Sequence, residues 1–187
     1  MTDAVVHIET ARLLLREWSD ADAAPFAAIN ADPAVMEFFP SALNRARSDA
    51  FLARIRENMA RDGYGLYALE VKDGAQLIGF TGLARPRFDA PFMPAIEIGW
   101  RLARRAWGQG YASEAAQAVV DRAFGSLGLD ELVSFTAEWN LPSRRVMERI
   151  GMTRDPNGDF LHPGVPPEHK LAHHVLYRID RIRWLNR

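Results

Sequence analysis

The chain has 187 residues, of which 48% are hydrophobic and 25% are charged, and its formal net charge is −1. This length and balance are typical of one globular domain and exclude a disordered or fibrous protein. Because so small a net charge gives no general attraction to nucleic acid or to an anionic membrane, we expect neither as a partner. The chain contains no cysteine, which excludes disulfides, thiolate metal sites and a cysteine nucleophile.

The N-terminal stretch carries charges at Asp3, Glu9 and Arg12. It has no apolar run of the length that a signal peptide or a transmembrane helix needs, so we expect a cytoplasmic protein. No internal repeat, low-complexity tract or linker divides the chain. We therefore expect a single domain over residues 1–187.

The first half of the chain alternates between predicted strands and helices. Apolar residues at every second position predict strands, and apolar residues three or four positions apart predict helices. In chain order these patterns give a strand at 12–17, a helix from Ser19 or Asp20 through Ile29, a helix at 48–61, and strands at 67–71 and 76–84. The Asp73-Gly74 pair between the last two strands indicates a hairpin turn.

The second half continues this alternation after a loop. Three prolines between residues 84 and 94 predict that loop. The patterns then give a strand at 95–102, a helix at 113–127, a strand at 132–136, a helix at 142–150 and a strand at 175–179. Strands that alternate with helices indicate an α/β or α+β sheet domain.

The junction at residues 105–112 leaves a strand, passes Gly108 and Gly110, and enters a helix. Glycines let the backbone approach an anion closely, and the first amides of a helix have no internal partner, so the junction is suited to phosphate. A glycine-rich turn without a ligand is the alternative. A Walker loop is excluded by its spacing, and a dinucleotide fingerprint is excluded because Ser113 occupies the place of the third glycine.

The same residues resemble a known family. The stretch Arg105-x-x-Gly108-x-Gly110 resembles the Arg/Gln-x-x-Gly-x-Gly/Ala signature of the GNAT superfamily of acetyl-CoA-dependent N-acetyltransferases. The stretch Asn140-x-x-Ser143-x-x-Val146-x-x-x-x-Gly151-Met152 is similar to the family's second conserved segment. Residues 9–16 and 96–100 resemble the branch that contains ribosomal-protein alanine N-acetyltransferases. The resemblance runs in order from residue 9 to about residue 153.

This resemblance implies a twisted mixed sheet, mostly antiparallel and flanked by helices, in which the strands at 95–102 and 132–136 splay apart. The pantetheine arm of acetyl-CoA would enter the gap, pair with the backbone of residues 98–100, and leave its pyrophosphate on residues 108–112. Arg104, Arg105 and Arg145 are candidates to reach phosphate oxygens. The implied cofactor-binding set is Ile98, Gly99, Trp100, Leu102, Arg104, Arg105, Trp107, Gly108, Gln109, Gly110, Tyr111, Ala112, Asn140 and Ser143.

The chemistry requires a base, because a protonated amine cannot attack a thioester. Glu97 is the first candidate, since a carboxylate on an otherwise apolar strand is costly unless it faces a cleft or a partner. A strand residue that faces solvent or pairs with an arginine is the alternative interpretation. Glu138, beside the splayed strand, is the second candidate for the base.

A departing thiolate benefits from a proton donor. Many family members place a tyrosine seven residues after the conserved asparagine, whereas this chain has Met147 there. Ser143 is the remaining hydroxyl at a matching site and is the predicted donor, either directly or through water. A helix cap or a plain contact to pantetheine is the alternative role of Ser143. Asn140 is expected to orient the cofactor.

Four of the five histidines lie in the proline-rich stretch 154–174. Their spacing does not match a zinc site, so we expect no metal. A loop of this length is usually functional or mobile, and with residues 38–40 it is expected to shape the amine pocket. The expected acceptor is a primary amine, with a protein N-terminus favoured over a small molecule, on a monomer or a homodimer. A non-catalytic acyl-CoA-binding or regulatory module is the alternative function.

Overall fold

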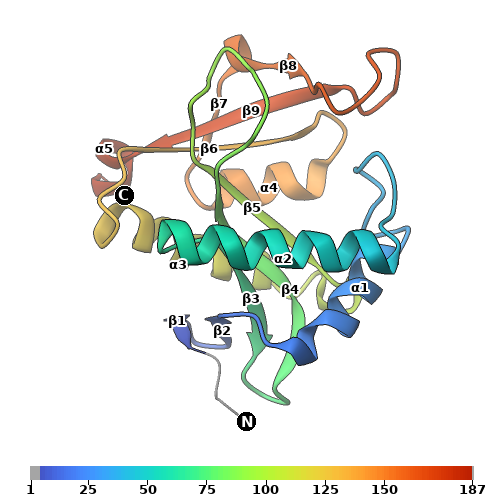
Figure 1. Cartoon of the computed structure of the whole chain (residues 1–187). Helices are drawn as coiled ribbons and strands as arrows, with labels where there is room; N and C mark the ends of the chain where they lie inside the picture. Colours follow the sequence, from blue (N-terminus) through green and yellow to red (C-terminus); the bar gives the residue numbers. More distant parts are fainter. Residues whose placement is uncertain (1–4, 187) are drawn as a thin grey trace.

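The computed structural model describes residues 5–186 and arranges them around one sheet of nine strands (Figure 1). The strand order is β1-β2-β3-β4-β5-β6-β9-β7, and β8 also pairs with β9. The strands are β1 Val6–Glu9, β2 Leu13–Arg16, β3 Leu66–Val71, β4 Gln76–Ala84, β5 Glu97–Leu102, β6 Glu131–Ala137, β7 Thr153–Arg154, β8 Phe160–Leu161 and β9 His173–Asp180. The helices are α1 Ala23–Ala31, α2 Arg45–Asp62, α3 Tyr111–Gly125, α4 Leu141–Arg149 and α5 Arg181–Leu185.

The strands β5 and β6 splay apart in the middle of the sheet. They are the parallel neighbours of an otherwise antiparallel sheet, and the register that joins them is the single pair Glu97 and Val133. By contrast, β5 is paired with β4 over its whole length. The mixed, mostly antiparallel sheet predicted from the sequence is confirmed, and the splay leaves one edge of β5 without a neighbouring strand.

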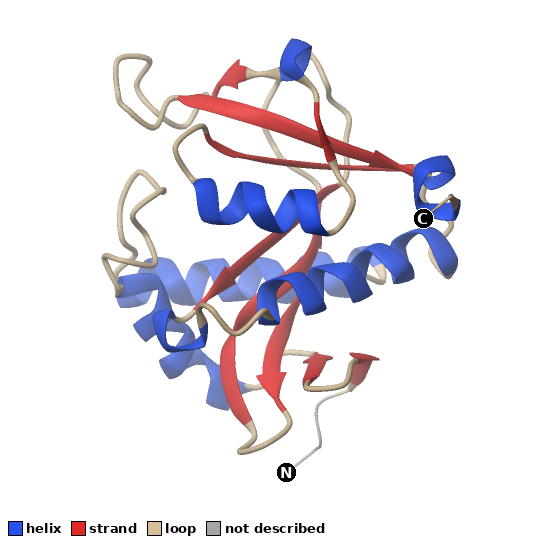
Figure 2. Ribbon diagram, turned by 180° about the vertical axis from the view of Figure 1, so that it is seen from behind, coloured by secondary structure: helices blue, strands red, loops and turns tan. Residues whose placement is uncertain are grey.

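Helices cover both faces of the sheet. Consecutive strand residues point to opposite faces, so neighbouring residues of one strand pack against different helices. Tyr67 and Leu69 of β3 pack with Val120 and Phe124 of α3 in the main core. Ala68, between them, packs with helices α1 and α2 in a second core. The view of Figure 1 has α2 in front of the sheet, and the reverse view of Figure 2 has α3 in front.

Several elements differ from the sequence prediction. Helix α2 begins three residues earlier than expected, because the Asn44 side chain accepts a hydrogen bond from the Arg47 amide and caps it. Strands β1, β7 and β8 and helix α5 were not predicted, since none is longer than five residues. The predicted domain also includes residues 1–4 and 187, which lie outside the described residues. Within residues 5–186, no helix is long and apolar enough to cross a membrane.

Candidate active site

The glycine junction forms an exposed loop that leads into α3. Gly108 and Gly110 have φ values of 74° and 79°, a left-handed conformation that favours glycine, and Gly110 is the N-cap of the helix. No side chain of the described residues caps this end. The first amides of α3 therefore remain available for an external acceptor, and the helix dipole adds positive potential there. The loop geometry fits a pyrophosphate.

An ion pair that sequence reasoning missed holds this loop. Arg12, just before β2, pairs with Glu114 in the first turn of α3 at 2.6 Å and donates to the Gln109 carbonyl at 3.0 Å. Thr10 donates to the same carboxylate at 2.6 Å. Burial opposes ionisation of Glu114, but the hydrogen bonds from Thr10 and Arg12 outweigh it and lower its pKa. Because 102 residues separate Arg12 from Glu114, no local pattern indicates their contact.

Several predicted cofactor residues have structural contacts of their own. The Arg105 guanidinium donates to the Leu77 carbonyl at 2.6 Å, so a phosphate contact would have to replace that bond. The Trp107 indole donates to the carbonyl of Leu102, whose side chain is buried in the core. Arg104 and Gln109 are exposed beside them.

Two helix residues flank this loop on the inner side. Tyr111 lies under the Arg12 guanidinium, which is 4.6 Å from the ring centroid. Tyr111 and Ala112 are half-buried against the main core and so fix the first turn of α3 to the sheet.

The predicted backbone edge for pantetheine lies on β5. Ile98 is fully buried, whereas Gly99 and Trp100 are half-buried. The Gly99 carbonyl accepts a hydrogen bond from the Thr81 hydroxyl of β4 at 3.1 Å. Beyond Glu97 no register pairs this strand with β6, so the other edge of β5 faces the gap. Its backbone groups suit a ligand that adds alongside as a strand would.

The start of α4 faces the same gap. Asn140 is its N-cap: the side-chain oxygen accepts from the Ser143 amide at 3.3 Å, and the amide group donates to the Thr136 hydroxyl at 2.9 Å. The side chain of Asn140, and not that of Ser143, therefore caps this helix. Within residues 5–186 the hydroxyl of Ser143 makes no hydrogen bond, and it is free to act on a ligand. Met147, at the tyrosine position of the family, is buried in the core.

Glu97 lies where β5 and β6 part. Its carboxylate has no hydrogen bond or ion pair among the described residues, and burial raises its pKa to about 8. A group with this pKa exchanges a proton near neutral pH, as a general base must. The carboxylate of Glu138, the other candidate, lies 3.6 Å from Nδ1 of His173, and the two form an ion pair when the imidazole is protonated. The geometry favours Glu97 over Glu138.

An aromatic cluster covers the sheet next to Glu97. Its rings come from the loop before β5, from β6 and from the histidine-rich stretch, with centroids 4.8 to 6.5 Å apart: Phe88, Phe92, Phe135, Phe160, His162 and His174. Burial lowers the pKa of His174 to about 4. Within residues 5–186 no group of three or more potential ligands is placed to hold a metal.

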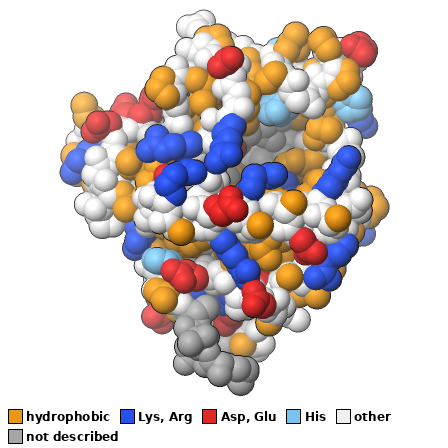
Figure 3. All heavy atoms as spheres, viewed as in Figure 1, with side chains coloured by type: hydrophobic (Ala, Val, Ile, Leu, Met, Phe, Trp, Pro, Cys, Tyr) orange, Lys and Arg blue, Asp and Glu red, His pale blue; other side chains and the backbone are white. Residues whose placement is uncertain are grey.

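The stretches 38–40 and 154–174 meet on this side of the sheet. Phe38 packs against Val165 and Leu171, and a pocket of about 330 Å³ lies between Phe38, Trp139 and Leu171. In Figure 3 this face is hollowed between α2 and the β6–β9 half, and basic side chains gather around the hollow. That these stretches shape the amine pocket stays a prediction.

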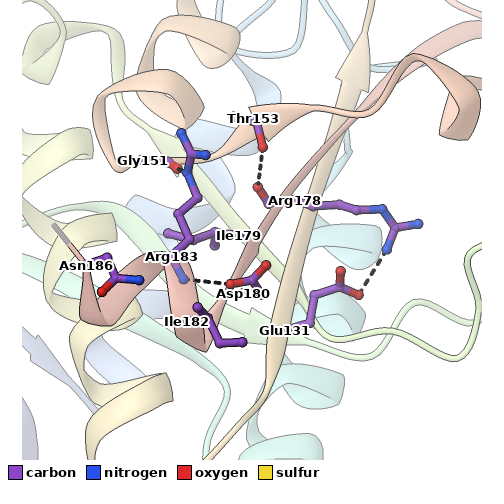
Figure 4. Close-up of a pocket in the computed structure, with 9 residues that line it drawn as sticks. All are labelled: Glu131, Gly151, Thr153, Arg178, Ile179, Asp180, Ile182, Arg183 and Asn186. Atoms are coloured by element: carbon purple, nitrogen blue, oxygen red, sulfur yellow. Dashed lines mark hydrogen bonds and ion pairs between the residues drawn. The ribbon is translucent and has the colours of Figure 1, made fainter.

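A larger groove, of about 730 Å³, lies at the far end of β9 (Figure 4). Several of the polar side chains that line it already bind one another or the backbone. Arg178 pairs with Glu131 at 2.9 Å, and Arg183 donates to the Gly151 carbonyl at 2.8 Å. None of the predicted site residues lines this groove.

Comparison with known proteins agrees with this geometry. The profile described as "Acetyltransferase (GNAT) domain" matches residues 12–153. The "Uncharacterized N-acetyltransferase YnaD" of Bacillus subtilis is 28% identical over 180 residues, which cover 96% of this chain and 99% of YnaD. An acetyltransferase structure from Agrobacterium tumefaciens is 30% identical, with 96% of each chain covered and a TM-score of 0.75.

The ribosomal-protein branch is similar in fold only. A ribosomal-protein-S5-alanine acetyltransferase structure from Vibrio fischeri has a TM-score of 0.75, but it is 18% identical, with 96% of this chain and 99% of that chain covered. The exposed glycine loop, the splayed β5 and β6, and the matched profile over most of the chain lead to one assignment. This chain belongs to the GNAT family of acetyltransferases.

Proposed function

We propose that this protein transfers an acetyl group from acetyl-CoA to a primary amine, by direct attack in a ternary complex. The observation that carries the proposal is the unpaired carboxyl of Glu97 at the mouth of the β5–β6 gap, with a pKa of about 8. The acceptor is either a small molecule or a protein N-terminus.

The residues present fit acetyl-CoA. The first-turn amides of α3 with Gly108 and Gly110 would hold the pyrophosphate, and the free edge of β5 would hold the pantetheine. When bound, acetyl-CoA supplies the acetyl thioester.

The protein's own groups would move the protons. Glu97, when ionised, accepts the proton that the ammonium form of the acceptor must lose before its nitrogen bonds to the acetyl carbon. The carbon–sulfur bond breaks as that carbon–nitrogen bond forms. The hydroxyl of Ser143 donates a proton to the leaving sulfur, directly or through water, and takes back the second proton that the acceptor nitrogen releases as the amide forms. Because Glu97 must be ionised to act, turnover should rise with pH towards its pKa of about 8.

Release of free CoA tests the proposal. A thiol reagent follows CoA without background, because the protein has no cysteine. We expect at least one primary amine in a broad panel to give CoA release together with a mass gain of one acetyl group. Tight binding of acetyl-CoA with no release from any amine would instead support the non-catalytic binding module, which the buried Met147 at the tyrosine position favours.

A further inference from the structure

One face of β5 carries three residues in a row: Glu97, Gly99 and Arg101. Alternate strand residues share a face, and the contacts of Arg101 with Phe51 of α2 identify it as the face towards α1 and α2. A Cβ built on Gly99 would meet one heavy atom within 4 Å, the Oε1 of Glu97 at 3.6 Å. The backbone of Gly99 is not left-handed, so its conformation does not require glycine. The Glu97 carboxylate therefore lies beside this position, and outside the neighbouring residues no other heavy atom comes within 4 Å of it.

Arg101 is a half-buried cation without an anionic partner among the described residues. Its Nη1 donates to the side-chain oxygen of the fully buried Asn30 at 2.6 Å, and its Nε is buried with no hydrogen bond. No carboxylate of the described residues pairs with it, and burial lowers its pKa to about 10. Burying an uncompensated charge is costly. Its fork therefore has donors to spare for a ligand.

Aromatic rings hold the Arg101 guanidinium in place. It lies 4.2 Å from the ring centroid of Phe39, 5.6 Å from Phe51 and 5.5 Å from Phe80. Such stacking fixes a guanidinium and leaves its edge free for hydrogen bonds. Phe80 is also the cross-strand partner of Arg101. The side chain is thus fixed from three directions.

The same molecule pairs another inward arginine fully. Arg16 of β2 donates to Asp22 and Glu70 at 2.7 to 2.9 Å, and both carboxylates are mostly buried. Arg16 thus has two carboxylate partners, whereas Arg101 has none among the described residues. The Cα atoms of Glu97 and Arg101 lie roughly 13 Å apart along an extended strand, and the two side chains make no ion pair.

We propose that the acceptor is a zwitterionic amino-carboxylate, such as an α-amino acid, that lies over Gly99 with its amine at Glu97 and its carboxylate at Arg101. This inference rests on the proposed function, because it places the acceptor amine at the proposed base. The basic side chains around the hollow in Figure 3 favour the same class of ligand by attracting its anionic end. A protein N-terminus lacks a carboxylate beside its amine and would leave Arg101 unpaired.

Matched acceptors test the proposal on the natural protein. Each pair is an L-α-amino acid and its carboxamide, taken across small, aromatic and basic side chains and assayed by CoA release. We expect the carboxylate of the preferred pair to have a kcat/KM roughly ten- to hundredfold higher, the value of a hydrogen bond to a charged group. The amine of the carboxamide is less basic than the amine of the amino acid, so more of it is neutral and able to react at a given pH. This difference alone would make the carboxamide the faster acceptor, opposite to the expected result. Equal rates, or a faster reaction with alanyl peptides, would overturn the proposal.

Variants at Arg101 and Gly99 locate the preference for the carboxylate. In Arg101→Met the ratio of kcat/KM for the carboxylate to kcat/KM for the amide should fall to about one, and Arg101→Lys should restore part of that ratio. Gly99→Ala should raise KM for the amino acid by more than it raises the Kd for acetyl-CoA, because the new methyl group enters the proposed acceptor space beside the Glu97 carboxylate. Arg181→Met, which removes the same charge from exposed α5, is the matched control and should keep the preference. A ratio unchanged in Arg101→Met would assign the preference elsewhere and overturn the proposal.

A binding measurement separates this inference from the proposed function. Calorimetry on the CoA-loaded natural protein compares an N-acetyl amino acid with the corresponding N-acetyl amide. We expect the carboxylate to bind at least about tenfold more tightly, even if no amine supports turnover. If the affinities differ but no amine releases CoA, the proposed transfer activity is refuted and the carboxylate site is supported. If CoA is released but the affinities are equal, the transfer activity is supported and the carboxylate site is refuted.

Discussion

The donor side and the acceptor side of the site are built from different parts of the chain. The proposed donor side consists of main-chain groups, from the loop at Gly108 and Gly110 and from the free edge of β5. The proposed acceptor side consists of side chains on one face of β5, Glu97 and Arg101, which have no charged partner among residues 5–186. A main-chain site needs only local geometry, whereas a side-chain site needs distant segments to bring the right groups together.

The largest effect should come from removing the acid of the acceptor side. Glu97→Gln should lower kcat by roughly 10²- to 10⁴-fold, the usual contribution of a general base, while acetyl-CoA affinity measured by calorimetry changes little. The loss should be larger for a lysine-like amine than for one of lower pKa, which is already partly neutral. Steady-state rates across amines of graded pKa provide the measurement.

The pH dependence gives the same prediction a second readout. Because Glu97 acts as its anion, kcat/KM of the natural protein should rise with pH to a plateau above about 8, and this step should be missing in Glu97→Gln. Glu138→Gln, which removes a carboxylate that already has His173 as a partner, is the matched control and should keep the step. If Glu97→Gln is as active as the natural protein with every amine, Glu97 is structural and Glu138 or water must take its place.

The next effect concerns the donor side. Gly108→Val and Gly110→Val should each weaken acetyl-CoA binding by roughly tenfold or more, because the left-handed backbone costs about 1–2 kcal/mol for other residues and the side chain blocks the pyrophosphate. Gly63→Val is the matched control, since Gly63 has a φ of 72° and open space around a Cβ, as Gly108 does, but ends α2. Calorimetric affinities that fall equally in all three variants would mean that strain, and not the phosphate, explains the loss.

These two sides also differ in how far the sequence predicts them. The glycine spacing and the following helix pattern predict the loop at Gly108, because each depends on neighbouring residues. Glu97 is predictable as an acid on an apolar strand. In the sequence, Arg101 looks like an ordinary strand residue. Its surroundings within residues 5–186, which include Asn30 and Phe39 but no carboxylate partner, come from a distant segment and are known only from the fold.

Short elements are missed for a related reason. Strand β7 and strand β8 have two residues each, so no periodicity can develop, and their pairing with β9 decides their conformation. The splay between β5 and β6 came from the family resemblance and not from the residue pattern. The contact of Arg12 with Glu114 needs the complete fold, because it joins the first strands to the middle of the chain.

A smaller effect should come from Ser143, where the two sides meet. Ser143→Ala should slow transfer by roughly tenfold, the low end for loss of a positioned acid. The loss should shrink when the acyl donor carries a more acidic thiol, because such a thiol leaves without protonation. Single-turnover rates with acetyl thioesters of graded thiol pKa provide the measurement. A loss that is the same for every donor would mean that Ser143 positions pantetheine and donates no proton.

A still smaller effect should come from the support of the loop. Arg12→Met should raise the Kd for acetyl-CoA by roughly threefold to tenfold, because it frees the Gln109 carbonyl and leaves the charge of Glu114 next to the pyrophosphate. The double variant Arg12→Met with Glu114→Gln should recover part of that affinity. If the second change gives no recovery, repulsion from Glu114 is not the cause, and the role of Arg12 is limited to holding the loop.

The smallest effect should be on stability, and it tests the burial of Glu97 without any assay of activity. The folded protein keeps the Glu97 proton up to a pH of about 8, whereas the unfolded chain loses it near its ordinary value of 4.5. The folded state therefore binds more protons between these values, and stability must fall as the pH rises through that range. Above about 8 both states are ionised and the penalty is constant.

Glutamine has no such charge, so the Tm of Glu97→Gln should match that of the natural protein near pH 4.5. It should exceed that Tm by roughly 2–4 °C or more at pH 8, the shift that 1 kcal/mol produces in a chain of this size. Calorimetric scans at both pH values provide the measurement. A Tm difference that stays constant with pH would show that Glu97 has an ordinary pKa, and its assignment as a base tuned by burial would then be wrong.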